Sequence, residues 1–383
     1  MSNEPQTMAT LNRRRVLAGA VGAGAAVMAG QWLQPSAAAD EKTKKRIKIG
    51  QIGTGHEHAS AKMDTFRKLS EHYEVVGIAE SDPALRKSHE NHRSYQGLPW
   101  MSEEELLNVP GLEAVAVEVS SADPRIMEIT GHCIDAGMHV HLDKPGGESF
   151  PAFKKVLDEA GRRKLAVQLG YMYRNNPCIH FCQRAVREGW LGQVFEIHCV
   201  MSITHGVAYR KYLGQFRGGS MFIFSCHLID LVVSLMGKPD RIVSFPRQIR
   251  TDVEMEMCDN GLIVFEYPKT TVTIRTASLE VEGYKRRQLV VCGDRGTIDI
   301  RPLEKFDIRS PQPLSLQLAL AEDRDPYKKG YQEVSFPTPP GRYDEQLIEL
   351  AQIIRGEREN PYPLEHELIV QQCLLEACGY PLS

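Results

Sequence analysis

The sequence has no marked excess of either charge and no long apolar run. Lys and Arg number 46 against 49 Asp and Glu, which gives a formal net charge of −3 over 383 residues. The missing basic excess argues against a nucleic-acid-binding protein, and the missing acidic block argues against a disordered tail. No segment reaches the roughly 18 consecutive apolar residues of a membrane-spanning helix, which excludes a multi-span membrane protein.

The remaining composition is that of a globular protein. Hydrophobic residues make up 42% of the chain and charged residues 25%, and the length predicts two to three domains. The nine cysteines are odd in number, so at least one is unpaired within the chain. Cys178 and Cys182 flank His180, but no second cluster completes a four-ligand site, and we expect no metal.

Residues 1–39 predict an export signal. Arg13 and Arg14 precede a weakly apolar stretch at residues 16–30, and small residues follow at 37–39. The arginine pair ahead of this stretch resembles a twin-arginine signal. That resemblance implies a periplasmic or exported protein, the twin-arginine export machinery as a partner, and a cofactor bound tightly before export.

Residues 40–170 predict a dinucleotide-binding domain. Short apolar segments alternate with helical ones, which is typical of a parallel sheet covered on both faces. The expected strands lie at residues 46–52, 73–79, 112–119, 138–142 and 165–169. The expected helices lie at residues 58–72, 124–136 and 150–163.

The first strand runs into a glycine motif of the form G-x-G-x-x-G, with His58 in the third glycine position. Gly53 permits a tight turn and Gly55 lets the backbone approach a pyrophosphate. Glu80 ends the second strand, where a carboxylate binds the adenosine ribose and repels a 2′-phosphate, so NAD is favoured. Arg86 and Lys87 follow closely in the sequence and could pair with a 2′-phosphate, so NADP stays a candidate cofactor. The predicted cofactor residues of this region are Gly53, Thr54, Gly55, His56, His58, Glu80 and Ser120.

Five motifs in order resemble the Gfo/Idh/MocA oxidoreductases, the family of glucose–fructose oxidoreductase and inositol dehydrogenase. The segment AGMHVHLDKPG at 136–146 is similar to the family's A-G-K-H-V-x-x-E-K-P, with Asp143 in place of Glu. The others are GYMYRNNP at 170–177, Leu-Gly at 191–192, GGS at 218–220 followed by HLID at 227–230, and the closing stretch 347–378.

The resemblance implies an α/β protein in which a Rossmann domain precedes an α/β domain with an open, mostly antiparallel sheet. We expect the second domain to span residues 171–383, to end in helices, and to form a homo-oligomer, a dimer or a tetramer. Strand patterns in the sequence agree at residues 194–203, 262–267, 271–277, 289–292 and 297–300, and residues 220–236 read as a helix.

The resemblance also assigns catalytic roles. Lys144 is expected to contact the nicotinamide ribose and the substrate hydroxyl, with Asp143, Pro145 and Arg174 as further cofactor residues. His227 would accept the hydroxyl proton, and Asp230 would orient its ring.

Ile223 departs from the family, whose dehydrogenases usually carry Asp four residues before this His. Three interpretations stay open: Asp230 or another acid substitutes, the enzyme is slow on a special substrate, or the reaction is not a simple dehydrogenation.

The substrate side is predicted from Tyr, His and Arg residues, which suit a hydroxylated ring by stacking and by hydrogen bonds to hydroxyls. The candidates are Tyr173, His205, Tyr209, Arg210 and Tyr212, together with His227. The expected substrate is a carbohydrate or a polyol.

Three functions compete. The first is an exported oxidoreductase that moves a hydride between a tightly bound NAD or NADP and a sugar or cyclitol. The second is an NAD-dependent enzyme that cleaves glycosides by transient oxidation and elimination, with no net redox change. The third is a non-catalytic ligand-binding protein on the same scaffold.

Overall fold

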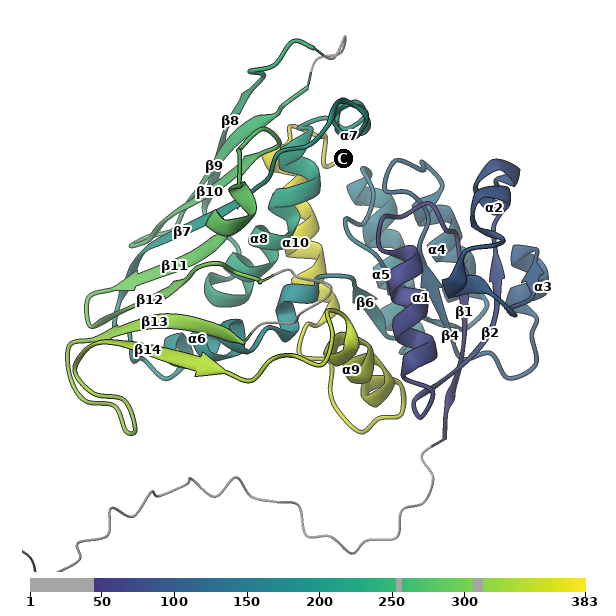
Figure 1. Ribbon diagram of the computed structural model, residues 1–383, viewed down its shortest axis with the longest axis horizontal. Helices are drawn as coiled ribbons and strands as arrows, with labels where there is room; N and C mark the ends of the chain where they lie inside the picture. The colour runs from purple at the N-terminus through teal and green to yellow at the C-terminus, as the bar shows by residue number, and fades with distance from the viewer. Residues whose placement is uncertain (1–44, 253–256, 306–312) are drawn as a thin grey trace, which may run out of the picture. The chain divides into compact units, whose positions relative to one another are not determined.

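Two sheets organise the protein, one in each half of the chain (Figure 1). The computed structural model describes residues 45–252, 257–305 and 313–383, and the predicted export signal at residues 1–39 lies outside them. No helix in these three ranges is both long and apolar enough to cross a membrane.

The first sheet has six parallel strands in the order β3-β2-β1-β4-β5-β6. All four residues of β4 are buried, as expected for a strand covered on both faces. This confirms the predicted N-terminal Rossmann-type α/β fold. The elements are β1 (Ile47–Ile52), α1 (Ala59–Lys68), β2 (Tyr73–Ala79), α2 (Pro83–His89), β3 (Trp100–Met101), α3 (Glu103–Leu107), β4 (Ala114–Val117), α4 (Ile126–Asp135), β5 (His139–Leu142), α5 (Phe150–Arg163) and β6 (Val167–Leu169).

Helix α1 is shorter than the 58–72 predicted from the sequence. It ends at Lys68, and Leu69 leaves the helical conformation with a ψ of 44°. The Leu69 carbonyl then accepts hydrogen bonds from the backbone nitrogens of His72 and Tyr73, at 2.9 and 3.0 Å. A turn therefore separates the helix from β2, where the sequence pattern alone reads as continuous helix.

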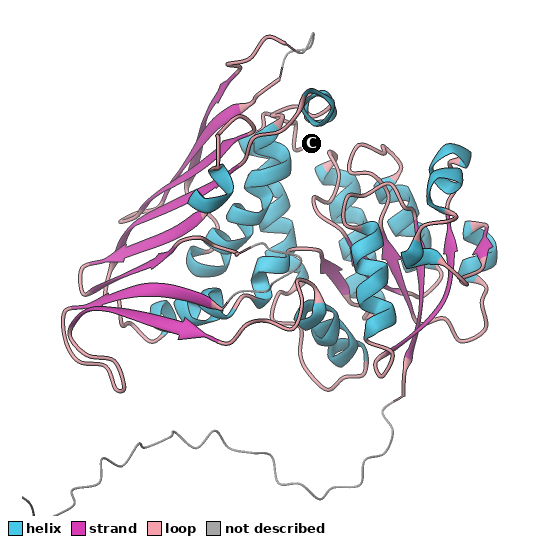
Figure 2. Ribbon diagram, viewed as in Figure 1, coloured by secondary structure: helices cyan, strands magenta, loops and turns pink. Residues whose placement is uncertain are grey.

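The second sheet has eight strands in the order β14-β13-β12-β11-β7-β10-β9-β8, and only β10 and β7 pair in parallel. This confirms the expected mostly antiparallel sheet. Its helices lie on one face, and the other face is open (Figures 1 and 2). The elements are α6 (Pro177–Arg187), β7 (Val194–Ser202), α7 (Val207–Leu213), α8 (Ser220–Met236), β8 (Arg241–Arg247), β9 (Asn260–Glu266), β10 (Thr271–Ala277), β11 (Gln288–Gly293), β12 (Gly296–Ile300), β13 (Leu314–Leu320) and β14 (Gly330–Phe336).

Two C-terminal helices, α9 (Asp344–Ile354) and α10 (Leu364–Ala377), tie the second half of the chain to the first sheet. The Tyr73 hydroxyl donates to the Leu347 carbonyl at 2.5 Å, and Gln371 Nε2 donates to the Gly147 carbonyl at 2.6 Å. The first bond holds the amino end of β2 close to α9, and the second holds the loop after β5, at the carboxyl end of a parallel strand, close to α10.

Candidate active site

The loop between β1 and α1 forms one wall of a cavity of about 790 Å³. Gly53 has a φ of +87°, and a Cβ there would lie 2.6 Å from the backbone nitrogen of Val119. A Cβ on Gly55 would lie 3.2 Å from the backbone nitrogen of Ser120. Both positions leave little room for a side chain, so the loop packs closely against the segment after β4, and both glycines line the cavity.

Glu80 follows β2 and lines the same cavity. Its Oε2 accepts from the Thr54 backbone nitrogen at 2.7 Å and from Thr54 Oγ1 at 2.8 Å, which fixes the carboxylate beside the glycine loop. The cavity volume lies within the range of small-molecule sites, and the glycine cradle next to a carboxylate fits a nicotinamide dinucleotide. Arg86 and Arg125 also line this cavity, so positively charged side chains lie there as well as the negatively charged Glu80.

The predicted residues Asp143, Lys144 and Pro145 form the turn after β5, and the Lys144–Pro145 peptide bond is cis. Lys144 is 4% exposed, and its carbonyl oxygen lies 3.2 Å from His56 Nε2. The residue lines a second cavity, of about 280 Å³. Lys144 therefore stands at the carboxyl end of a parallel strand, where open α/β sheets place their ligands.

His227 lies on α8 and lines this second cavity together with Lys144. Within the described residues, its Nδ1 has no hydrogen-bond partner. Burial, followed by the charge of Lys144, holds the pKa of His227 well below its ordinary value, so the ring is uncharged at neutral pH. Ile223, also on α8, lines the cavity where the family resemblance places a carboxylate.

Asp230 and Arg174 bind each other instead of taking the predicted roles. Arg174 Nη2 lies 2.6 Å from Asp230 Oδ1, Arg174 Nη1 lies 2.6 Å from Glu367 Oε1, and His366 Nε2 lies 2.9 Å from Asp230 Oδ1. Arg174 and Asp230 are 2% and 1% exposed, and neither lines either cavity. This geometry differs from the two predictions that Asp230 orients His227 and that Arg174 contacts the cofactor. Asp230 and His227 are both buried on α8, and the ion-pair partners of Asp230 are Arg174 and His366.

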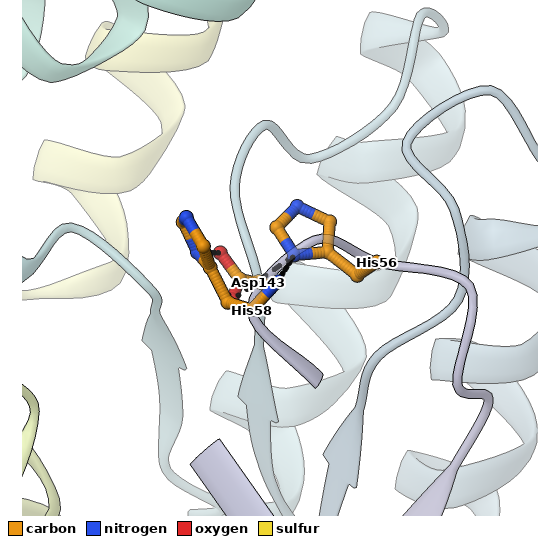
Figure 3. A group of neighbouring side chains, drawn as sticks. All are labelled: His56, His58 and Asp143. Atoms are coloured by element: carbon orange, nitrogen blue, oxygen red, sulfur yellow. Dashed lines mark hydrogen bonds and ion pairs between the residues drawn. The ribbon is translucent and has the colours of Figure 1, made fainter. Parts of the chain in front are cut away.

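Asp143 is the centre of a buried polar cluster (Figure 3). Its Oδ2 lies 3.3 Å from His56 Nδ1, 3.1 Å from His58 Nδ1 and 3.2 Å from Lys62 Nζ. Burial alone would raise the pKa of Asp143, but His56, Lys62 and His58 hold it well below its ordinary value. Burial and the Asp143 charge raise the pKa of neighbouring Glu118 well above its ordinary value, so Asp143 carries the negative charge.

Besides His227, two of the predicted substrate residues line the second cavity. His205 and Tyr209 do so with their rings 4.0 Å apart, and burial lowers the pKa of His205 to about 4. Tyr212 packs beside Tyr209 at 5.5 Å between ring centroids but does not line the cavity. Arg210 is buried behind them, where it donates to the His205 carbonyl at 2.8 Å and pairs with Asp252. Arg210 therefore supports this wall of the cavity from behind.

Residues that the sequence reasoning missed complete the cavity. Arg287 and Arg342 line it, and both pair with Glu304, at 2.8 and 3.3 Å. Tyr173, a predicted substrate residue, donates to the same Glu304 at 2.5 Å and packs against His227. Glu57, inside the glycine motif, also lines the cavity. Only Glu57 could have been found from a motif, because the arginines come from loops far along the chain.

Comparison with known proteins gives the family. A model described as the oxidoreductase family with an NAD-binding Rossmann fold matches residues 47–171, and a GFO/IDH/MocA C-terminal domain matches residues 179–299. Together they cover well over half of the sequence. The chain belongs to the Gfo/Idh/MocA family of NAD-binding oxidoreductases.

Relatives of this Gfo/Idh/MocA member are distant. The uncharacterized oxidoreductase YhhX of Escherichia coli is 24% identical over 44% of this chain and 52% of its own length. Inositol 2-dehydrogenase 1 of Saccharopolyspora erythraea is 25% identical over 40% of this chain. The chain thus spans about half the length of these two relatives, at 52% and 45%.

Solved structures show the same fold over most of the chain. The aldose–aldose oxidoreductase of Caulobacter crescentus superposes with a TM-score of 0.71 at 18% identity, over 88% of this chain and 98% of that one. The WlbA dehydrogenase of Bordetella pertussis, solved with NADH and UDP-GlcNAcA, gives 0.69 at 14% identity, over 88% and 97%.

Proposed function

We propose that this protein is an exported oxidoreductase that moves a hydride between a tightly held NAD and a hydroxyl-bearing carbon of a sugar, cyclitol or related polyol. One observation carries the proposal. Lys144, from the turn after β5, and His227, from helix α8 of the second half, line one cavity next to the nucleotide-binding loop. Hydride transfer needs this arrangement, a reacting hydroxyl between polar groups at the nicotinamide end of a nucleotide site.

Oxidation of an alcohol carbon releases a hydride and a proton. NAD held at the glycine loop would supply the hydride acceptor. Lys144 donates a hydrogen bond to the hydroxyl oxygen, and an uncharged histidine of the cavity takes the proton. His205, Tyr209 and Arg287 line the same space and suit the remaining hydroxyls of the substrate.

Export and tight binding rest on the sequence. The signal-like segment at residues 1–39 carries an arginine pair, and the export route that it resembles carries folded proteins. Outside the cytoplasm no pool of free NAD is at hand, so a cofactor loaded before export has to stay bound and be recycled there. Glu80 at the ribose end favours NAD over NADP, because its carboxylate repels a 2′-phosphate.

A second copy of the chain is the proposed partner. The open face of the second sheet is the surface expected to form a dimer or tetramer. Large exposed side chains lie on three strands of this sheet, Phe195 on β7, Phe245 on β8 and Tyr331 on β14. These strands are the two edges and an inner strand of the sheet, so a second copy that covers the sheet would bury all three side chains.

Glycoside cleavage through transient oxidation is the second candidate, and Glu57 favours it. Elimination needs an acid to protonate the leaving group in addition to the base that takes the hydroxyl proton. Glu57 lines the cavity together with His58 and Lys144, so a carboxyl group lies among the other candidates for proton transfer.

Two assays on the full chain separate these functions. If the protein is a net oxidoreductase, absorbance at 340 nm rises with myo-inositol or glucose, and p-nitrophenyl β-D-glucoside releases no nitrophenol. If it is the glycoside-cleaving enzyme, nitrophenol appears without added nucleotide and without a net change at 340 nm. A chain that gives neither signal with any of these probes contradicts both functions and supports the non-catalytic alternative.

A further inference from the structure

A second histidine faces the cavity that holds His227 and Lys144. His58 begins the segment leading into α1, is 12% exposed at its side chain, and lines this cavity. Its Nδ1 lies 3.1 and 3.2 Å from the two carboxylate oxygens of Asp143. Figure 3 shows the other ring nitrogen pointing away from Asp143.

The surroundings of Asp143 decide which nitrogen of His58 carries the proton. Two further donors lie at the Asp143 carboxylate: Lys62 Nζ at 3.2 Å and the backbone nitrogen of Lys144 at 2.8 Å. With these partners the carboxylate is ionised and accepts hydrogen bonds only. His58 Nδ1 therefore carries the proton, and Nε2 is left with a lone pair on the side away from the carboxylate.

His227 lacks such an orienting partner. Its Nδ1 has no hydrogen-bond partner within the described ranges, and Asp230 is held by Arg174 and His366. A general base works best when a third group fixes its tautomer and stabilises the cation that forms. Of the two rings, His58 has this arrangement and His227 does not.

We propose that the His58–Asp143 pair is the proton acceptor of the reaction, and that His227 serves to bind the substrate. This inference rests on the proposed hydride transfer. As the substrate C–H bond breaks and its hydride leaves for the nucleotide, the O–H bond breaks and the proton passes to His58 Nε2. The carbon–oxygen bond becomes a carbonyl. Burial lowers the pKa of His58 to about 3, and the Asp143 carboxylate offsets part of this cost when the ring takes the proton. In the reverse direction His58 returns the proton.

The same three side chains, His56, His58 and Asp143, also have spacings that suit a metal ion. Two observations oppose that reading. Lys62 already places a cation 3.2 Å from the shared carboxylate oxygen. His56 has both ring nitrogens engaged, Nε2 with the Lys144 carbonyl and Nδ1 with the backbone nitrogen of His58, each at 3.2 Å. The His58–Asp143 pair is therefore assigned as a proton acceptor and not as part of a metal site.

Nitrogen NMR of the full chain with 15N-labelled histidine tests the tautomer without any substrate. The His58 resonances are assigned by their loss in His58→Gln. We expect a protonated Nδ1 and a bare Nε2 at pH 7. A proton on Nε2, or zinc found at one equivalent by elemental analysis of the purified protein, would overturn the proposal.

Turnover tests the role. With whichever of myo-inositol and glucose the wild type consumes, His58→Gln should lower kcat by about 100-fold or more, with NAD affinity within about threefold of wild type. His227→Gln should mainly raise KM. His132→Gln is the matched control, because His132 lies on the surface of α4 and pairs with Glu103.

The two proposals fail in different ways. If the wild type consumes myo-inositol or glucose and His58→Gln equals it in kcat, the assignment of the base is wrong and the proposed function stands. If the wild type consumes neither of them, the proposed function fails and the base role fails with it. In both cases the NMR experiment still reports whether Asp143 orients the ring.

Discussion

Replacement of Lys144 by methionine should lower turnover by about 10²- to 10⁴-fold, the range expected when a group positioned at the reacting atoms is lost. Methionine keeps most of the buried methylene chain and removes the ammonium group, so the change tests charge and hydrogen bonding with little loss of packing. Nucleotide binding should weaken by less than about tenfold, since the glycine loop and Glu80 are untouched. The measurements are kcat with the consumed probe and the Kd of NAD from quenching of intrinsic fluorescence.

Lys154→Met is the control for this substitution. Lys154 lies on α5, is 51% exposed, and pairs with Asp158 one helical turn away at 2.5 Å. Its replacement should leave both turnover and NAD affinity unchanged. If Lys144→Met keeps more than about a third of wild-type kcat, Lys144 does not act on the reacting hydroxyl.

Replacement of Asp230 by asparagine should destabilise the fold by about 3 kcal/mol, because it removes one carboxylate from a buried Arg174 and leaves only Glu367. Urea unfolding of the full chain measures the change. The control is Asp158→Asn in the exposed pair with Lys154, which should change stability by less than about 0.5 kcal/mol. If Asp230 instead oriented His227, the variant would lose turnover while its urea midpoint stayed at the wild-type value.

The effect of Asp230 depends on pH in a direction set by its pKa. Burial alone would raise the pKa of Asp230, but Arg174 and His366 hold it below its ordinary value. A carboxyl with a depressed folded-state pKa stabilises the fold above its unfolded pKa, near 4, and loses this contribution as pH falls further. The gap in stability between wild type and Asp230→Asn should therefore be full at pH 7 and shrink below about pH 4.

The fold could be predicted well from the sequence because local residue patterns determine where most of its helices and strands lie. The ranges expected for α5, α8 and β10 agree with the structure, since each is bounded by residues that begin or end an element, such as Ser149 capping α5 and Gly237 ending α8. The strands β13 and β14 were not predicted from the sequence. They are stabilised by pairing with each other and with β12, contacts that no local pattern reports.

The site was predicted only in part because its geometry depends on distant segments. Gly53, Gly55 and Lys144 lie in motifs whose roles are local, and the structure places them around the two cavities. The partners of Asp230 are Arg174 and His366, and His366 lies on α10, more than 130 residues further along the chain. Helical spacing alone therefore suggested the wrong neighbour for Asp230. Asp143 was predicted only as a cofactor residue. Its cluster with His58 and Lys62 could not be predicted, because it forms only when α1 packs on β5.

Identification of the nucleotide carried by the purified protein tests the central claim most directly. The full chain is expressed in a host with a twin-arginine pathway, recovered from the periplasm, denatured, and the supernatant is examined by mass spectrometry. The account predicts NAD or NADH at close to one equivalent per chain, with NADP in the minority because of Glu80. A chain recovered without nucleotide that also fails to bind added NAD or NADP in solution would contradict the proposed function.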